Sequence, residues 1–178
     1  MKKTMTILAG ALLATTFAYA QPVPAAEASA QILLPDNGTI TGSVKENIRK
    51  KGEVQFTTDG KRTRYKAGDI SALRIGDTRY ITHNYTFYEV ITENNDITLL
   101  RKANEPASIQ YQGKEAIAIT SEGDIDDLFV RKGSGSLQLL TKKNWKEAVA
   151  RLCDKCNTDA ANFDQEALKK AIESCSCK

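Results

Sequence analysis

The cysteines are the residues whose type and spacing most clearly allow chemistry. The chain has four, and they lie near its C-terminal end as two close pairs, Cys153 with Cys156 and Cys175 with Cys177. An even number of cysteines in an exported protein is typical of disulfides, each of which stabilises a fold by about 2 to 4 kcal/mol. We therefore expect two disulfides in this segment.

Two other chemistries use the same residues. Two close cysteine pairs can supply the four thiolates of a tetrahedral zinc site, so a zinc-binding protein is the alternative function. A Cys-x-x-Cys motif can also be a redox centre. In thioredoxin-like proteins, however, that motif opens a helix after a strand, whereas Cys153 and Cys156 close an expected helix.

The connectivity of the cysteines depends on the path of the chain between the two pairs. In a simple antiparallel helical hairpin the second pair returns beside Trp145, roughly 12 to 16 Å from the first pair at 1.5 Å per residue. Cross-pairing becomes possible if residues 157–162 run back along the first helix, which about six extended residues can do. We favour cross-pairing, because a ring closed between Cys175 and Cys177 would be strained.

Other catalytic patterns are missing from the sequence. The chain has one histidine, His83, so a single chain cannot build a multi-histidine metal site, and a histidine in a β segment is usually structural or solvent-facing. No nucleophile elbow, phosphate loop or dinucleotide fingerprint is present. We therefore expect a protein that is not an enzyme and that has no catalytic residues and no cofactor. A redox or hydrolytic enzyme, with His83 or a cysteine in the leading role, is the third hypothesis.

One acidic stretch could offer oxygen ligands to calcium. It consists of Glu122, Asp124, Asp126 and Asp127. Because the stretch lacks the ordered ligand spacing of a calcium loop, we favour a solvated turn.

Charge is unevenly distributed along the chain. Basic residues outnumber acidic ones ten to five over residues 45–79, and acidic residues lead nine to three over residues 80–128. The basic half could form an anion-binding face or the solvated edge of β-strands, where basic residues discourage aggregation. The candidate anion-binding residues are Lys50, Lys51, Arg62, Arg64 and Lys66.

The N-terminus has the pattern of a secretory signal peptide. Lys2 and Lys3 precede an apolar run, and Ala18, Tyr19 and Ala20 form an A-x-A cleavage site. We expect residues 1–20 to be removed, residues 21–30 to form a flexible leader, and the mature chain to contain no transmembrane segment. The predicted location is periplasmic, outer-membrane-associated or secreted.

Residues 31–140 predict an all-β domain. Short β-branched and aromatic runs alternate with turn signals such as Asn37-Gly38 and Asp59-Gly60, and the longest β-prone segment covers residues 79–92. Strands are also expected over residues 109–111, 116–120, 125–130 and 137–140. This pattern favours an antiparallel barrel or sandwich with meander connections.

Residues 141–178 predict a helical hairpin that carries the four cysteines. Thr141 stands where a helix N-cap would, and apolar residues from Trp145 onward recur at helical spacing. A second helix is expected over about residues 164–173. Trp145 and Phe163 are interpreted as core anchors. The predicted fold is thus mainly β with a C-terminal two-helix tail.

The chain resembles a broad group of uncharacterised exported proteins of Bacteroidota. The resemblance is carried by residues 32–44, Tyr65, Asp69-Ile70, Arg74-Ile75-Gly76, residues 87–90 and residues 140–145 with the tail that follows. It implies export but no activity. Our hypothesis is therefore an exported, non-enzymatic envelope or secreted protein that acts as a binding module. The expected partner is an envelope protein or an anionic glycan, and not a nucleic acid.

Overall fold

The computed structural model describes residues 28–94, 96–105, 109–112, 115–118, 121–153 and 163–175, with no side-chain description at residues 46, 47, 50 and 106–120. The predicted signal peptide and most of the predicted leader lie outside the described residues. Strand β1 begins at Ala28, so the last three positions of the predicted leader are already paired in the sheet.

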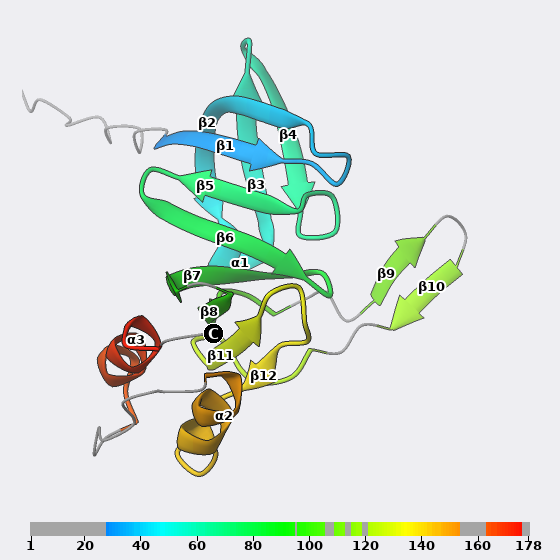
Figure 1. Cartoon of the computed structure of the whole chain (residues 1–178). Helices are drawn as coiled ribbons and strands as arrows, with labels where there is room; N and C mark the ends of the chain where they lie inside the picture. The colour runs from blue at the N-terminus through cyan, green and yellow to red at the C-terminus, as the bar shows by residue number, and fades with distance from the viewer. Residues whose placement is uncertain are drawn as a thin grey trace, which may run out of the picture.

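Twelve strands and three helices follow one another along the described chain (Figure 1). The strands are β1 (Ala28–Leu33), β2 (Thr39–Asn47), β3 (Glu53–Thr58), β4 (Lys61–Lys66), β5 (Ala72–Ile75), β6 (Thr78–His83), β7 (Thr86–Asn94), β8 (Ile97–Lys102), β9 (Ile109–Gln112), β10 (Glu115–Ala118), β11 (Leu128–Lys132) and β12 (Gln138–Leu139). The helices are α1 (Ile48–Lys51), α2 (Trp145–Leu152) and α3 (Gln165–Glu173).

Ten of these strands form one antiparallel sheet in the order β12-β11-β8-β7-β6-β5-β1-β2-β3-β4, and β9 and β10 pair separately. Strands β1 to β4 form one meander and β5 to β8 form a second. The meanders join because β1 pairs with β2 on one side and with β5 on the other. The mainly β, antiparallel, meander-connected fold is thus confirmed, as a single open sheet with β4 at one edge and β12 at the other.

The sheet curls strongly around its N-terminal core. Val54 and Phe56 of β3 lie in the same buried cluster as Phe87 of β7. In a flat sheet these strands would be about 24 Å apart, because five strand spacings of about 4.8 Å separate them. They can share a core only because the strands between them bend, as Figure 1 shows for β1, β2, β5 and β6 around β3.

Gly42 permits this bend in β2. A Cβ atom at this position would lie 2.3 Å from the carbonyl oxygen of Thr57 and 2.7 Å from the ring of Phe56. No side chain fits that space, so the close approach of β2 to β3 requires glycine.

The two C-terminal helices pack against the other end of the sheet. Trp145 of α2 and Leu168 and Ile172 of α3 are buried against Leu99 of β8 and Val130 of β11. Trp145 is therefore a core anchor, as predicted, and Phe163 packs at the border of the same cluster. Within the described residues, no helix is long and apolar enough to cross a membrane.

The start of α2 differs from the prediction. The N-cap position is Asn144 rather than Thr141, because residues 141–144 form a separate turn in which the backbone N–H of Thr141 donates to Asn144 Oδ1 at 2.7 Å. Helix α3 begins as expected after Asp164, whose carboxylate accepts a hydrogen bond from the N–H of Ala167 at 2.8 Å.

Two predicted strands also have different limits. The segment over residues 79–92 is divided into β6 and β7 by a tight turn in which Asn84 and Tyr85 have φ values of 46° and 58°. The strand expected to begin at Ile125 begins at Leu128, because Asp126 has a φ of 75° and belongs to the preceding turn.

Candidate functional site

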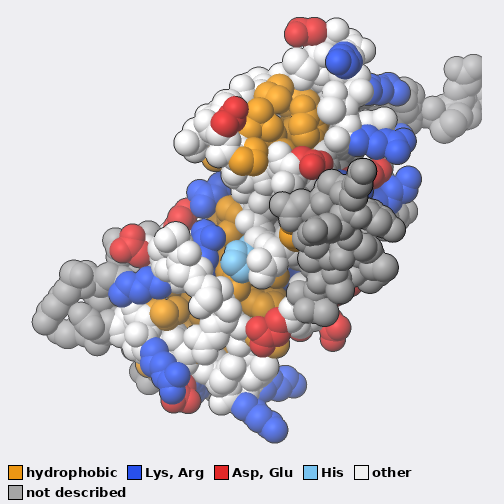
Figure 2. All heavy atoms as spheres, turned by 90° about the vertical axis from the view of Figure 1, so that its right-hand side faces the viewer, with side chains coloured by type: hydrophobic (Ala, Val, Ile, Leu, Met, Phe, Trp, Pro, Cys, Tyr) orange, Lys and Arg blue, Asp and Glu red, His pale blue; other side chains and the backbone are white. Residues whose placement is uncertain are grey.

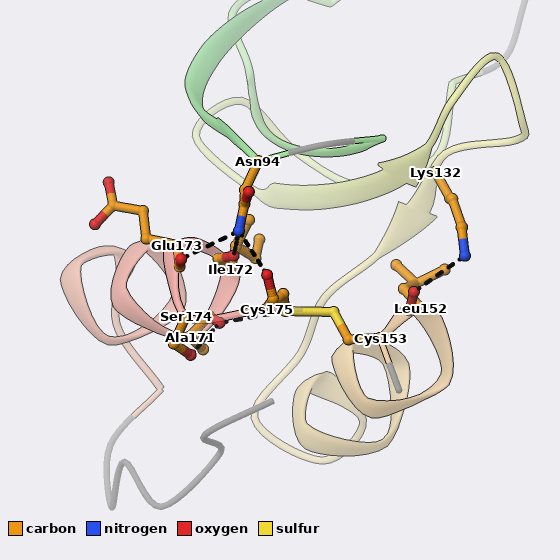
Figure 3. Close-up of a disulfide and its surroundings, with 9 residues drawn as sticks. All are labelled: Asn94, Lys132, Leu152, Cys153, Ala171, Ile172, Glu173, Ser174 and Cys175. Carbon is orange, nitrogen blue, oxygen red and sulfur yellow. Dashed lines mark hydrogen bonds between the residues drawn. A yellow bond between two sulfur atoms is a disulfide. The ribbon is translucent and has the colours of Figure 1, made fainter. Parts of the chain in front are cut away.

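A disulfide joins Cys153 to Cys175 (Figure 3). The two cysteines are 22 residues apart in the sequence, their Cα atoms are 5.8 Å apart, and both side chains are buried. Cross-pairing between the two cysteine pairs is therefore confirmed for these residues. Cys156 and Cys177 lie outside the described residues.

The disulfide brings the carboxyl ends of α2 and α3 together, since Cys153 directly follows α2 and Cys175 follows α3. A simple antiparallel hairpin would instead separate these ends. The sequence suggested such a hairpin because helical spacing defines which face is buried but not the direction in which a helix docks.

Asn94 of β7 holds the end of α3 against the sheet. Its side-chain amide donates to the carbonyl oxygens of Ile172 at 2.8 Å, Glu173 at 3.1 Å and Cys175 at 2.8 Å (Figure 3). The Ile172 carbonyl also accepts a hydrogen bond from the backbone N–H of Cys175 at 3.0 Å, so Asn94 adds a side-chain donor from the sheet to the C-terminal cap of α3. The disulfide and this cap act as one structural clamp.

The clamp bears on the zinc hypothesis. In this pairing the sulfurs of Cys153 and Cys175 are bonded to each other and are not thiolate ligands. In the part of the chain that the structure describes, no three histidine, cysteine or acidic side chains are grouped so that they could hold a metal ion.

The predicted basic residues gather at the β4 edge of the sheet. Arg62, Arg64 and Lys66 occupy alternate positions of β4, so they point to the same face, and all three are exposed. Lys51 is exposed in α1, and Lys50 also belongs to α1 although its side chain is not described. Figure 2 shows Lys and Arg side chains at the upper right of the molecule and others along its left side and at its lower end.

The pairing of β2, β3 and β4 adds one residue to this basic surface. Lys45 lies opposite Gln55, and Gln55 lies opposite Arg64, which makes one row across three strands. The buried side chains of β3 are Val54 and Phe56, so this row faces outward. Lys45 could not be assigned to this surface from the sequence, because its place in the row depends on the strand register. We call Lys45, Arg62, Arg64 and Lys66 the basic edge surface.

His83 is the only histidine of the chain, and Figure 2 shows it in pale blue at the molecular surface. Partial burial, together with the nearby Arg131 guanidinium, lowers the pKa of His83 below 6.5. Both effects disfavour the imidazolium form. A catalytic triad would need a carboxylate that orients the His83 ring. Among the described residues, no carboxylate forms a hydrogen bond with this ring.

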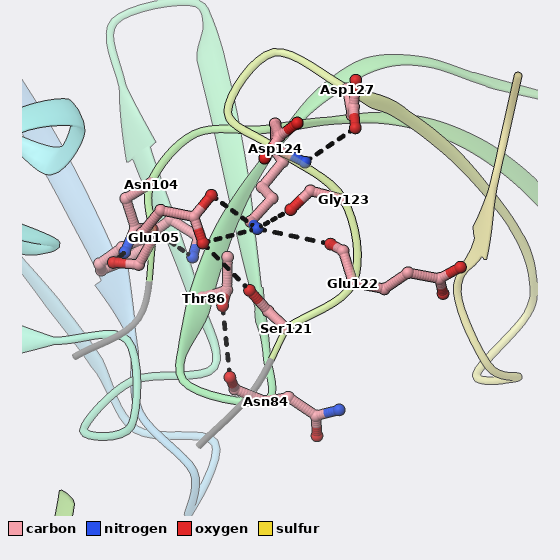
Figure 4. Close-up of polar contacts among 11 residues, drawn as sticks. Asn84, Thr86, Asn104, Glu105, Ser121, Glu122, Gly123, Asp124 and Asp127 are labelled. Carbon is pink, nitrogen blue, oxygen red and sulfur yellow. Dashed lines mark hydrogen bonds and ion pairs between the residues drawn. The ribbon is translucent and has the colours of Figure 1, made fainter. Parts of the chain in front are cut away.

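The acidic stretch is organised by a buried lysine (Figure 4). The ammonium group of Lys102 lies 2.9 and 2.8 Å from the two carboxylate oxygens of Glu105 and also donates to the carbonyl oxygens of Glu122 and Gly123. Its side chain is fully buried, whereas that of Glu105 is 52% exposed. The loop therefore closes around a cation that belongs to the chain itself, and we call Lys102, Glu105, Glu122 and Gly123 the lysine cage.

Two aspartates of the stretch have structural partners. Asp127 accepts a hydrogen bond from the backbone N–H of Asp124 at 2.8 Å, and Asp126 forms an ion pair with Arg49. These contacts fit the turn that was expected rather than a calcium loop, whose carboxylates must converge on one point.

Comparisons of the chain with protein-family models, with curated proteins and with solved structures found no match. The resemblance to exported Bacteroidota proteins therefore stays a prediction.

Proposed function

We propose that this chain is an exported, non-enzymatic protein that binds an anionic envelope glycan through the basic edge surface. The exposed cations of β2 and β4, the two strands that pair on either side of β3, carry the proposal. Cationic side chains on one face attract a polyanion and contribute to both affinity and on-rate.

Only one acidic side chain opposes this surface by strand register. Glu53 lies directly opposite Lys66, whereas Arg62 and Arg64 lie opposite Thr57 and Gln55. Basic residues also protect edge strands against self-association, and β4 is the edge strand of the sheet. The two explanations differ because edge protection requires no affinity for any particular partner.

The test is binding of the oxidised protein to immobilised dextran sulfate, with neutral dextran as the reference. Each basic side chain near an anionic surface contributes about 1 kcal/mol, so Arg62→Gln/Arg64→Gln should weaken binding about thirtyfold. The matched control Lys142→Gln/Lys143→Gln removes the same charge from exposed residues before α2 and should bind almost as tightly as the parent. If both double variants lose the same amount of affinity for dextran sulfate, binding depends only on net charge. Protection of the edge strand would then be the explanation for the basic residues of β4.

Binding to polyglutamate in place of dextran sulfate distinguishes a protein partner from a glycan. Preference for polyglutamate at equal charge density would assign the surface to an acidic envelope protein. Because the Debye length shortens from about 14 Å at 50 mM salt to about 6 Å at 300 mM, either interaction should weaken with added salt.

Export is supported by the N-terminal pattern, and the disulfide is compatible with an oxidising compartment. The measurement is the intact mass of protein recovered from the native envelope, before and after alkylation without reductant, together with its metal content. A mass that begins at Gln21 and resists alkylation agrees with the proposal. Retention of residues 1–20 would contradict export by cleavage, and alkylatable thiols with one equivalent of zinc would favour the metal-binding alternative.

A further inference from the structure

A pocket of about 290 Å³ opens on the outward face of the curled sheet, and its lining includes none of the residues of the basic edge surface. Strands β1, β2, β5 and β6 form it, and these strands lie across the upper half of Figure 1. Its lining includes Gln31, Leu33, Thr39, Ala72, Arg74 and Arg79. We call this the arginine pocket.

Two arginines face each other directly in the arginine pocket. Arg74 of β5 is the cross-strand partner of Arg79 of β6, and Gln31 of β1 is the partner of Arg74 on the other side. Like charges in directly opposed positions destabilise a sheet, so a purely structural role does not explain this pair. An anion held between the two guanidinium groups would offset the repulsion.

One of the two arginines already binds a carboxylate of the chain. Arg79 forms an ion pair with Glu93 at 2.9 Å, and both side chains remain more than 40% exposed. The side chain of Arg74 is exposed and forms no hydrogen bond or ion pair with the described residues. The site therefore contains two guanidinium groups. That of Arg79 is paired with the Glu93 carboxylate, which a ligand carboxylate could replace, and that of Arg74 is available to bind a ligand.

The rest of the lining suits a small ring that carries hydroxyl groups. The amide of Gln31 and the hydroxyl of Thr39 can exchange hydrogen bonds with such groups, while Leu33 and Ala72 provide apolar contact for the C–H face of a ring. Ligand pockets commonly have volumes of about 300 to 1,000 Å³, so this one is sized for a single small ring.

We propose that the arginine pocket binds a uronic acid, the guanidinium groups of Arg74 and Arg79 holding its carboxylate while Gln31 and Thr39 contact its hydroxyl groups. Arginine suits this task because its planar fork can bind both oxygens of a carboxylate. The proposal goes beyond the basic edge surface, since it concerns other residues and a ligand of defined size.

The test is an NMR titration of the oxidised protein with monomeric glucuronate. A ligand of this size in a shallow pocket should bind with a dissociation constant of about 1 mM and shift the resonances of β1, β5 and β6. Glucuronamide, which lacks the charge, should bind at least tenfold more weakly, because charge-assisted hydrogen bonds are lost. Absence of saturable shifts at about 20 mM glucuronate, or equal binding of glucuronamide, would overturn the proposal.

Two variants act in opposite directions. Arg74→Gln should weaken glucuronate binding at least tenfold, whereas Glu93→Gln should strengthen it severalfold because the competing carboxylate is removed. Lys142→Gln removes an exposed charge before α2, outside both proposed surfaces, and is the control that should leave glucuronate binding unchanged. If Arg74→Gln binds like the parent, or if acetyl-alanine binds as tightly as glucuronate, the uronic acid assignment is wrong.

The two proposals fail separately in these experiments. If Arg74→Gln loses glucuronate binding but still binds dextran sulfate, the pocket is the glucuronate site and is not needed for dextran sulfate binding. If Arg62→Gln/Arg64→Gln loses dextran sulfate binding but still binds glucuronate, the basic edge surface is the dextran sulfate site and is not needed for glucuronate binding. Each variant is exposed at the substituted position, and its folding is checked in the same NMR spectra.

Discussion

The lysine cage leads to a prediction that runs against the usual ranking of buried and exposed residues. Lys102 is fully buried and Glu105 is half-exposed, so the lysine would ordinarily be the more damaging residue to replace. We expect the opposite order. Glu105→Gln should cost more stability than Lys102→Met.

The order follows from what each substitution leaves behind. Lys102→Met removes a buried charge together with its desolvation cost and keeps the apolar stem, while the remaining carboxylate of Glu105 is exposed enough to be hydrated. Its main cost is the lost partner of the Gly123 carbonyl, about 1 to 2 kcal/mol. Glu105→Gln leaves a fully buried ammonium group without its counter-charge, which costs about 3 kcal/mol after allowance for the exposure of Glu105.

The double variant sharpens the test. Once Lys102 is replaced, no ammonium group remains to be neutralised, so Lys102→Met/Glu105→Gln should be more stable than Glu105→Gln alone by about 1 to 2 kcal/mol. Urea unfolding followed by fluorescence measures all three, because Trp145 is the only tryptophan and is buried.

The control is Glu166→Gln, which removes an exposed carboxylate 3.8 Å from Lys170 and should cost less than about 1 kcal/mol. A cost for Glu105→Gln as small as that of the control, or a double variant less stable than Glu105→Gln, would refute the reasoning about the cage.

Three further predictions concern His83, the disulfide and the cap of α3. Because the pKa of His83 is lower in the folded protein than the 6.5 of the unfolded chain, the unfolded chain binds the proton first as pH falls. Stability should therefore decline as pH drops below about 6.5 and level off below the folded pKa, and His83→Gln should abolish this dependence. Cys153→Ser/Cys175→Ser should lose about 3 kcal/mol of unfolding free energy, as expected for opening a loop of 22 residues. Asn94→Ala should lose about 1 to 2 kcal/mol of unfolding free energy, because the three side-chain hydrogen bonds that tie the end of α3 to β7 are removed.

Urea unfolding between pH 5 and 8 checks the first of these, and NMR titration of the His83 ring gives its folded pKa directly. A ring that titrates at 6.5 or above would contradict the assigned causes. For the disulfide, reductant should destabilise the parent more than the serine variant, which no longer has the Cys153–Cys175 bond. If Asn94→Ala has the same unfolding free energy as the parent, water must replace the hydrogen bonds of the Asn94 cap at no cost in stability.

The turns were the most predictable part of the fold. The sequence placed turns at Asn37-Gly38 and Asp59-Gly60, where the structure has φ values of 65° at Asn37, 51° at Asp59 and 73° at Gly60. Such positions favour asparagine, aspartate and glycine for local steric reasons that need no tertiary information. The turn at Asn84-Tyr85 escaped notice because tyrosine is uncommon at positive φ.

The arginine pocket could not be predicted, because it depends on the pairing of β1 with β5. That pairing joins residues about forty positions apart and sets Gln31 opposite Arg74. Alternation within a strand says which face a residue occupies but not which strand lies beside it. The burial of Lys102 could not be predicted either, because a lysine at the end of an apolar strand is normally exposed to solvent.

The positions of the two proposed surfaces separate them from the cysteine tail. Helices α2 and α3 cover β8 and β11 at one end of the strand order, whereas the arginine pocket lies on β1, β2, β5 and β6 and the basic edge surface ends at β4. A protein whose function resides in the sheet should therefore bind glucuronate and dextran sulfate equally well in the parent and in Cys153→Ser/Cys175→Ser, provided that both are folded. If the serine variant is folded but binds neither, the cysteines control the function, and the zinc and redox hypotheses regain priority over binding by the sheet.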